Sequence, residues 1–248
     1  MAADVALPRS QPLAEPAEAG ASYRIAKRAV DLVLASLAII LLSPLLLVLA
    51  VAIAVDSPGP IIFSQQRIRG RRREDGDEDE KVWLTEPFTL FKFRTMRFRA
   101  DHSIHREYMS AYLTGDEQRL RELRPERKEG DSYRPANDPR VTRLGAILRK
   151  FSLDEIPQLW NVIRGEMSLV GPRPPVPYEV EMYSERALRR LACKPGLTGW
   201  AQVRGRTSIG FEELLRLDLD YLDRRSTLFD LKILFLTVPV VLSRRGAD

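Results

Sequence analysis

The chain contains few of the residues that build disulfides and many common active sites. Its 248 residues include one cysteine, Cys193, and two histidines, His102 and His105. A single cysteine excludes an internal disulfide and a zinc site built from cysteines. Two histidines with charged neighbours give no support to a histidine-ligated metal or a serine–histidine triad. No glycine-rich stretch has the spacing of a P-loop, so the sequence does not indicate a Walker-type nucleotide hydrolase.

One long segment of the chain lacks charge altogether. Residues 32–55, LVLASLAIILLSPLLLVLAVAIAV, would form about 36 Å of helix, enough to cross a bilayer core of about 30 Å. Pro44 in the middle of this run predicts either a kinked spanning helix or a re-entrant helix that returns to its side of origin. Basic residues flank both ends, with Lys27 and Arg28 before the run and Arg67 after it, as expected if both ends stay in the cytoplasm. The residues alone leave both topologies open.

The remainder of the chain has room for one globular domain of ordinary size. The net charge of +5 suits an anionic membrane surface or a phosphorylated ligand, and taken alone it also suits a nucleic acid. Residues 1–22 are rich in alanine, proline and small polar residues, which predicts a disordered tail. The basic and then acidic run over 69–80 predicts an exposed, flexible loop whose basic half could touch lipid headgroups. Residues 101–130 predict a peripheral helix pair or a partly mobile loop.

Three further segments carry local signals. Alternation over residues 88–94 predicts a strand with Lys92 and Arg94 on one face. The sequence GPRPP at 171–175 predicts a rigid, non-helical loop. The uncharged part of residues 228–242 is too short to span a membrane and predicts either an interfacial amphipathic helix or a core helix.

Two adjacent carboxylates, Asp154 and Glu155, lie at a predicted helix start inside an apolar frame. One interpretation is structural, with Ser152 as the N-cap and Glu155 completing a capping box near the positive end of the helix dipole. The other is catalytic, because the surrounding motifs contain more cations than two acids need. These cations are Lys92, Arg140, Arg143, Arg149, Arg173, Arg204 and Arg206.

The catalytic interpretation fits a particular chemistry. A helix start favours a phosphate, but two acids would repel that phosphate unless a divalent metal bridged them. Carboxylates together with phosphate oxygens form a typical Mg²⁺ shell. A diphosphate substrate, Mg²⁺ and a carboxylate nucleophile therefore fit one site.

Several blocks of the sequence, taken together, resemble the bacterial sugar transferase family, the monotopic polyprenyl-phosphate phosphoglycosyl transferases. These blocks are Ser43-Pro44 within the apolar run, FKFRTM at 91–96, LRKFSLDEIPQLWNVIRGEMSLVGPRP at 148–174 and KPGLTGWAQVRGR at 194–206. They occur in the family's order and cover nearly everything from residue 23 to 242. The likeness is to the short form of the family, which contains only the catalytic domain.

The resemblance implies an enzyme that transfers a sugar-1-phosphate from a UDP-sugar to undecaprenyl phosphate and releases UMP, as the first membrane step of glycoconjugate assembly. It implies Mg²⁺ as cofactor, membrane lipid as a partner, no nucleic acid, and it allows a homodimer. The location implied is the bacterial inner membrane, with the catalytic domain on the cytoplasmic face. The alternatives are a membrane glycosyltransferase that releases UDP and a non-enzymatic, membrane-anchored basic binding protein.

The fold implied is α+β and mainly helical. It comprises the tail over 1–22, a re-entrant helix hairpin over 23–56 broken at Ser43-Pro44, and a cytoplasmic catalytic domain over 57–248 with short strands and interfacial amphipathic helices. The charged run at 70–86 departs from the family pattern and is expected to be a loop insertion.

The resemblance also assigns roles to residues. Asp154 would be the nucleophile, giving a phosphosugar carried on the enzyme, and Glu155 would be its partner near Mg²⁺, with both acids close to the metal. Lys92 and Arg149 match positions that serve catalysis. The implied substrate-binding residues are Pro172, Arg173, Pro174, Arg206 and Asp218, and the implied membrane residues are Ser43 and Pro44.

Overall fold

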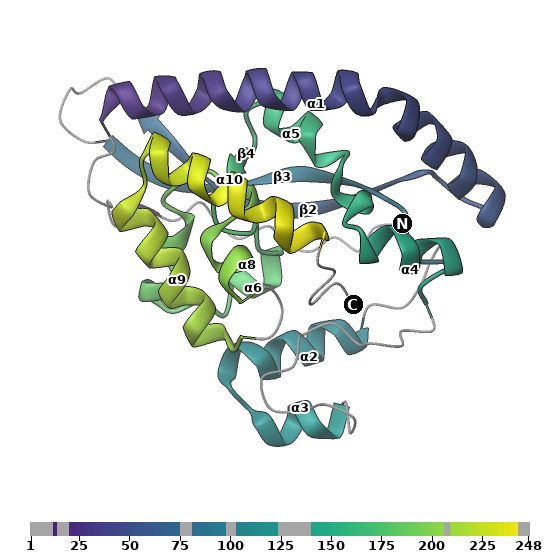
Figure 1. The fold of residues 1–248 in the computed structure, drawn as a ribbon. Helices are drawn as coiled ribbons and strands as arrows, with labels where there is room; N and C mark the ends of the chain where they lie inside the picture. Colours follow the sequence, from purple (N-terminus) through teal and green to yellow (C-terminus); the bar gives the residue numbers. More distant parts are fainter. Residues whose placement is uncertain are drawn as a thin grey trace.

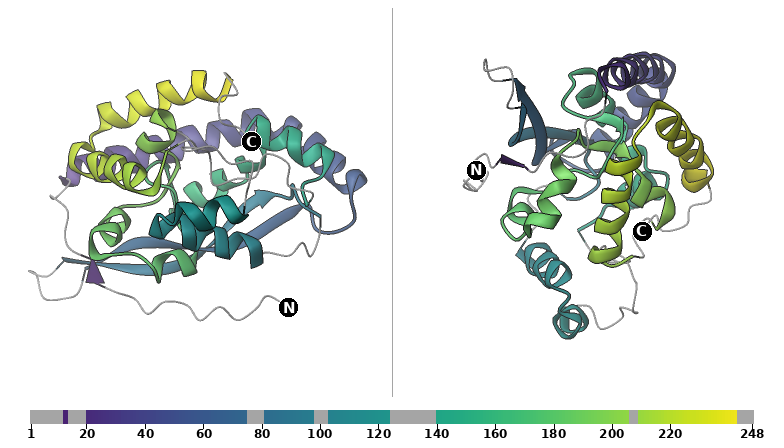
Figure 2. Two further views of the ribbon diagram at one scale, coloured as in Figure 1. Left: turned by 90° about the horizontal axis from the view of Figure 1, so that it is seen from below. Right: turned by 90° about the vertical axis from the view of Figure 1, so that its left-hand side faces the viewer.

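The structure is a computed structural model. It describes residues 12–13, 20–74, 81–97, 103–123, 140–205 and 209–242. Within these ranges the chain is mainly helical with a few strands, which confirms the α+β class predicted from the sequence. Figures 1 and 2 show one long helix along one side of the molecule and a small helix pair at the opposite end, with a β-hairpin between them.

The long helix is α1 (Ala21–Asp56), and Pro44 lies inside it. Proline has no N–H, so the carbonyl of Ile40 lacks its usual helical donor. The hydroxyl of Ser43 donates to that carbonyl instead, at 2.8 Å. The helix therefore continues through Ser43-Pro44, where the sequence led us to expect a break, and Figure 1 shows it bending toward its C-terminal end. Whether both ends face the same side of a membrane stays a prediction.

The surface of α1 is apolar and largely uncovered. By length and composition α1 could cross a membrane, and only 11% of its most apolar window is buried. The C-terminal helix α10 (Thr227–Leu242) contacts it and has two apolar faces of its own. Phe229 and Ile233 are buried in the core, whereas Leu228 and Phe235 are 80% and 77% exposed. Apolar residues exposed on a helix beside α1 are typical of a helix at a lipid interface.

The hairpin consists of β2 (Ile62–Glu74) and β3 (Lys81–Phe93), paired antiparallel with Gln65 opposite Leu90. A two-residue strand, β1 (Pro12–Leu13), pairs with the other edge of β3. Part of the predicted disordered tail is thus a strand, while residues 1–11 and 14–19 lie outside the described residues.

The prediction of a loop over the charged run is wrong for residues 70–74 and 81–86, which belong to the paired strands. Arg69 and Arg71 both form ion pairs with Glu86 across the hairpin, so charges that suggested a solvated loop are cross-strand partners. Gly70 also packs against the domain, where an added β-carbon would lie 1.7 Å from the carbonyl oxygen of Leu191. The hairpin is therefore longer and more closely attached than an insertion loop.

The helix pair at the far end is α2 (Ser103–Thr114) and α3 (Glu117–Leu123), as the sequence predicted for this region. The remaining elements form the body of the domain. They are α4 (Arg143–Lys150), the 3₁₀ turn η1 (Leu153–Glu155), α5 (Gln158–Ile163), β4 (Ser168–Val170), α6 (Pro177–Val180), α7 (Glu185–Leu188), the 3₁₀ turn η2 (Arg189–Leu191), β5 (Gly196–Thr198), α8 (Trp200–Arg204) and α9 (Phe211–Arg224). Strands β4 and β5 pair in parallel.

The main core joins the hairpin, the centre of the domain, α1 and the C-terminal helices. It contains buried side chains from the hairpin, the centre of the domain and the C-terminal helices, including Ile68, Val162, Met167, Tyr221 and Ile233. A smaller cluster under α4 connects the C-terminal half of α1 to the end of β3 through Leu49, Ile53, Phe93 and Leu148. The long helix is thus packed against the domain at both of its ends.

Candidate active site

The predicted site residues meet where β3 ends beside α4 and η1. Asn161 of α5 holds this arrangement together and is fully buried. Its side-chain amide donates to the carbonyl of Thr89 at 2.7 Å, and its oxygen accepts from the backbone N–H of Phe91 at 3.2 Å. A satisfied buried amide fixes the helix against the strand. The dyad Asp154–Glu155 is thereby held opposite Lys92.

The two acids of the dyad have different surroundings. Glu155 forms an ion pair with Lys92, at 3.8 Å between Oε1 and Nζ. Asp154 is only 6% exposed, and its carboxylate makes no hydrogen bond or ion pair with any residue that the structure describes. Buried carboxylates are ordinarily paired or hydrogen-bonded. An acid kept without a partner is suited to bonding with something outside the chain.

The backbone before Asp154 also departs from the sequence prediction. Ser152 adopts the left-handed conformation, with φ of 55°, and its side chain makes no capping hydrogen bond. The predicted capping box is therefore wrong. The residues after Ser152 form a 3₁₀ turn, and α5 starts only after Pro157. A non-glycine residue in this region is strained, and such strain is concentrated at functional sites.

Gly165 lies just beyond the end of α5, after the C-cap residue Arg164. Gly165 has φ of 77°, and the N–H groups of Gly165 and Glu166 bond back to Val162 and Asn161. This pattern is a Schellman motif. Arg28 of α1 donates to the carbonyls of Val162 and Ile163, each at 2.7 Å, so the long helix also caps α5.

Arg149 lies in the last turn of α4 and is held from the strand side. Its Nε donates to the hydroxyl of Thr95 at 2.9 Å. The carbonyl of Thr95 accepts from the N–H of Thr142, which is the N-cap of α4. Gly145 fits directly over Thr95, since an added β-carbon would lie 2.1 Å from that carbonyl oxygen. The structure thus brings Lys92, Arg149 and the dyad to one place.

The predicted rigid loop lies between β4 and α6, and residues 171–176 there adopt no helix or strand. Neighbouring backbones hold it: Arg67 donates to the carbonyl of Pro174 at 2.9 Å, and Gly196 donates to that of Pro172 at 2.8 Å. Burial, with the nearby Arg67, lowers the pKa of Arg173 to about 10. The local environment disfavours the Arg173 cation, so a bound anion would stabilise it.

Asp218 has a partner within the protein. It is 2% exposed and accepts from Arg190 at 2.9 Å from Nε and 2.6 Å from Nη2. Arg190 also donates to the hydroxyl of Tyr183 at 2.7 Å and to the carbonyl of Arg173 at 3.3 Å. Asp218 therefore reaches the 171–176 loop through Arg190, while the substrate contact inferred from the resemblance stays a prediction.

The remaining predicted site features are only partly described. Arg206 lies outside the described residues. Within the described ranges, no group of three or more histidine, cysteine, aspartate or glutamate side chains could hold a metal ion. The dyad therefore supplies two acids, which fits Mg²⁺ because that ion is usually bound by one or two carboxylates together with substrate phosphates.

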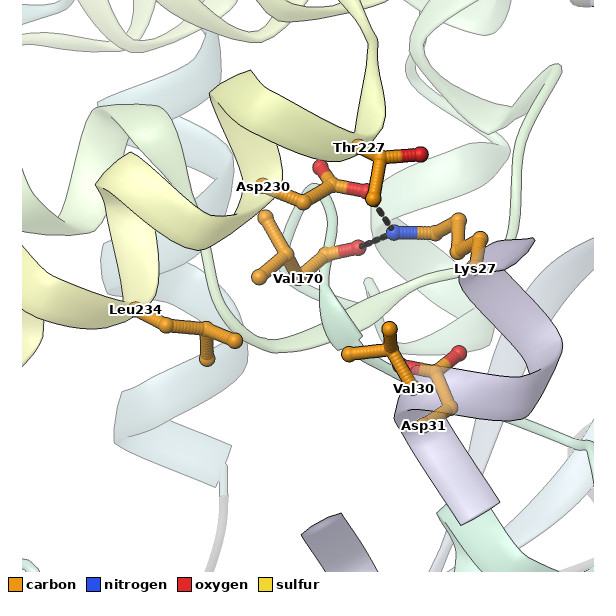
Figure 3. A pocket seen from close by; sticks show the side chains of 7 residues that line it. All are labelled: Lys27, Val30, Asp31, Val170, Thr227, Asp230 and Leu234. Atoms are coloured by element: carbon orange, nitrogen blue, oxygen red, sulfur yellow. Dashed lines mark hydrogen bonds and ion pairs between the residues drawn. The ribbon is translucent and has the colours of Figure 1, made fainter. Parts of the chain in front are cut away.

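A polar junction joins the start of α1 to β4, which leads into the 171–176 loop. Figure 3 shows it beside a small pocket between α1 and α10. Lys27 donates to the carbonyl of Val170 at 2.9 Å and forms an ion pair with Asp230 at 2.8 Å. The carboxylate of Asp31 accepts from the hydroxyl of Ser168 at 3.0 Å and from the N–H of Leu169 at 2.9 Å. The long helix is thus bonded to the strand that carries the loop.

Sequence reasoning missed four residues that support the site: Asn161, Thr95, Arg94 and Arg190. Arg94 was predicted to share a strand face with Lys92, but it follows the last residue of β3 and is buried against the end of α1. Thr95 and Arg94 belong to the FKFRTM block, so that motif was the available signal for them. Arg190 lies in a charged stretch of the sequence, and no local pattern there predicted that its side chain would be buried.

Comparisons with known proteins identify the family. The family model described as bacterial sugar transferase matches residues 22–244. The chain is 38% identical over 241 residues to the exopolysaccharide production protein ExoY of Rhizobium meliloti, covering 96% of each chain. The chain belongs to the bacterial sugar transferase family, as its motifs predicted, and it is an enzyme that transfers sugar phosphates.

Other relatives are longer. The chain is 38% identical over 223 residues to the UDP-glucose:undecaprenyl-phosphate glucose-1-phosphate transferase of Escherichia coli, covering 87% of this chain and 40% of that protein. It is 36% identical over 226 residues to the undecaprenyl-phosphate galactose phosphotransferase of Salmonella typhimurium, covering 91% of this chain and 42% of that one.

Proposed function

We propose that this protein transfers a sugar-1-phosphate from a UDP-sugar to undecaprenyl phosphate, releasing UMP, through a covalent phosphosugar on Asp154. The observation that carries the proposal is the Asp154 carboxylate, which is buried and without a partner among the described residues, beside a dyad glutamate that is paired with Lys92. Relatives named for transferring glucose-1-phosphate or galactose phosphate to undecaprenyl phosphate support the same reaction class.

The first step uses the free carboxylate. One oxygen of Asp154 bonds to the phosphorus that carries the sugar, the bond from that phosphorus to UMP breaks, and UMP leaves with the electron pair. In the second step an oxygen of the lipid phosphate bonds to the same phosphorus. The bond to Asp154 then breaks and the carboxylate is restored. Each step exchanges one phosphorus–oxygen bond for another.

The cations around the dyad stabilise the charge that moves in these steps. Lys92 and Arg149 are held by Glu155 and Thr95, so their positions are fixed before substrate arrives. Arg173, on the 171–176 loop, offers a partly buried guanidinium to a second phosphate group. Pro172 and Pro174 keep that loop rigid.

Mg²⁺ is part of the proposal, with Asp154 and Glu155 as the residues that would hold it. When bound, the ion would draw charge from the phosphate oxygens and so favour departure of UMP. Because the structure offers two acids and no larger cluster among the described residues, the substrate's phosphates would complete the ion's shell.

The location follows from the two substrates. A UDP-sugar is dissolved in water and undecaprenyl phosphate is confined to the bilayer, so the reaction must occur at their boundary. The apolar surface of α1 and the exposed face of α10 would keep the domain there. We assign the protein to the cytoplasmic face of the bacterial inner membrane, with α1 re-entrant, in exopolysaccharide, capsule or related glycoconjugate assembly.

The test is a nucleotide-release assay on detergent-purified protein with undecaprenyl phosphate, Mg²⁺ and a panel of UDP-sugars. UMP released with one sugar would establish phosphoglycosyl transfer and identify that sugar. UDP as the product would contradict the proposal and show a transferase that moves the sugar alone. No nucleotide from any sugar, in protein shown to be folded, would also contradict it.

A further inference from the structure

The guanidinium of Arg94 donates several hydrogen bonds to the C-terminal end of α1 and to the segment just after it. Its Nη1 donates to the carbonyl of Pro60 at 2.7 Å, and its Nη2 donates to the carbonyl of Ile53 at 3.3 Å. Nη2 also donates to Ser57, both to its carbonyl and to its hydroxyl, the latter at 3.0 Å. The last turn of α1 and the chain that leaves it are therefore fixed by a single side chain.

The charge of Arg94 is balanced in an unusual way. The residue is 5% exposed, and within the described ranges it forms no ion pair with a carboxylate. The carbonyls of Ile53 and Ser57 lie at the negative end of the helix dipole, where a cation is favourable, and the carbonyl of Pro60 lies just beyond it. The Nη1 and Nη2 groups of Arg94 find their partners only there, while its buried Nε has no hydrogen-bond partner among the described residues, so the burial of this arginine depends on the helix end being in place.

The segment that carries Arg94 also carries the site. Two residues earlier, Lys92 forms an ion pair with Glu155. One residue later, Thr95 holds Arg149 and the start of α4. The backbone N–H of Arg94 itself bonds to the carbonyl of Ile61 at 2.9 Å. Displacing the end of α1 would therefore displace the end of β3. That strand end carries Lys92 and, through Thr95, holds Arg149, the two cations near the dyad.

We propose that Arg94 is a positioning residue that fixes the active site relative to the membrane helix, and so controls use of the lipid acceptor more than use of the nucleotide donor. This inference rests on the proposed function. The physical reason is that the acceptor's depth is set by the bilayer, whereas the donor arrives from water. A small shift between α1 and the site leaves the donor's approach intact and misplaces the lipid phosphate.

The test separates the two halves of the reaction. Formation of UMP from UDP-sugar without acceptor reports the donor step, and transfer from the loaded enzyme to undecaprenyl phosphate in nanodiscs reports the acceptor step. Arg94→Lys keeps the charge but loses the planar fork that reaches several carbonyls at once. We expect its donor step to stay within about threefold of wild type, while KM for the acceptor rises by about tenfold.

A second variant disturbs the same contact from the other side. Gly59 has φ of 123°, so Gly59→Ala strains the turn that presents the carbonyl of Pro60 to Arg94. It should shift acceptor KM in the same direction, to a smaller extent. The matched control is Gly115→Ala, at a glycine with φ of 70° and open space around it between α2 and α3. That control should leave both steps unchanged.

Hydrogen–deuterium exchange supplies a readout without activity. In Arg94→Lys, the amides of residues 53–61 should exchange faster than in wild type, and those of α2 should not change. Equal losses in both steps, or no change in acceptor KM in either the Arg94 or the Gly59 variant, would overturn the inference. If wild type itself released no UMP, the proposed function would fail instead, so the two failures are distinguishable.

Discussion

Asp154 and Asp218 are both buried aspartates, and they differ in what surrounds the carboxylate. Asp218 accepts two hydrogen bonds from one guanidinium, at 2.6 Å and 2.9 Å, and both members of that ion pair are almost fully enclosed. Asp154 is 6% exposed and has no partner in the described part of the chain. One acid is already bonded within the protein, and the other is available to a ligand.

This difference separates structural from reactive roles. A buried acid that is paired with a cation supports the fold, because removing either residue of the ion pair leaves the other charge buried without a partner. A buried acid without a partner gives the fold no such ion-pair stabilisation. Its presence therefore indicates a role in binding a ligand or a metal, or in forming a bond during the reaction. The same contrast predicts opposite results when each acid is changed to its amide.

The largest effect is expected for Asp154→Asn. The amide has nearly the same shape but cannot bond to phosphorus as a carboxylate does, so turnover should fall by about a thousandfold or more. Because Asp154 has no partner to lose among the described residues, the melting temperature should stay within about 2 °C of wild type. Turnover and thermal unfolding are measured on the same preparation. Retained turnover would remove the assignment of Asp154 as nucleophile.

Asp218→Asn should do the reverse and act first on stability. Breaking one side of a buried ion pair costs about 3–5 kcal/mol, which denaturant unfolding can measure. The double variant Asp218→Asn with Arg190→Met should recover part of that loss, since no charge is then left buried. If the single variant is stable but cannot bind UDP-sugar, Asp218 contacts substrate directly, as the family resemblance implied.

Glu155→Gln tests the second acid of the dyad. We expect turnover to fall by about a hundredfold and the Mg²⁺ concentration needed for half-maximal rate to rise, because one of the two acids proposed to hold the ion is lost. The ion pair with Lys92 is also lost, but both side chains are partly exposed, so stability should change little. An unaltered Mg²⁺ dependence in a partly active variant would contradict the metal role.

A smaller effect is expected at Arg173. Arg173→Gln should weaken binding of UDP-sugar by about tenfold, measured by calorimetry, with little change in the rate of bound substrate. Burial and Arg67 lower the pKa of this guanidinium to about 10, so its cation is present below that pH and is lost above it. Affinity in the wild type should therefore decline as pH rises through about 10. The same decline in Arg173→Gln would mean that another group is responsible.

Much of this arrangement could be predicted from the sequence. The length and apolarity of α1 follow from an uncharged run, and α4 follows from the spacing of Leu144 and Leu148. The dyad, Lys92 and Arg149 were found because the motifs that contain them are specific to a family. These signals are local, so one stretch of sequence was sufficient for each.

What the sequence missed depends on contacts between distant segments. Residues 70–74 and 81–86 of the charged run form paired strands in which Arg69 and Arg71 meet Glu86, a pairing visible only when the register is known. Ser152 was predicted to cap a helix, but it takes a left-handed conformation and η1 forms instead. Arg94 was expected on a strand face, yet its acceptors lie at the end of α1 and just beyond it, 34 to 41 positions earlier.

The most direct test of the account is to trap the enzyme after its first step. Purified protein is mixed with the UDP-sugar identified by the nucleotide-release assay and Mg²⁺, without lipid acceptor, then quenched in acid and analysed by peptide mass spectrometry. The account predicts one UMP per active enzyme and the mass of the sugar phosphate on the peptide that contains Asp154. Release of UDP, or the added mass on a peptide without Asp154, would contradict it.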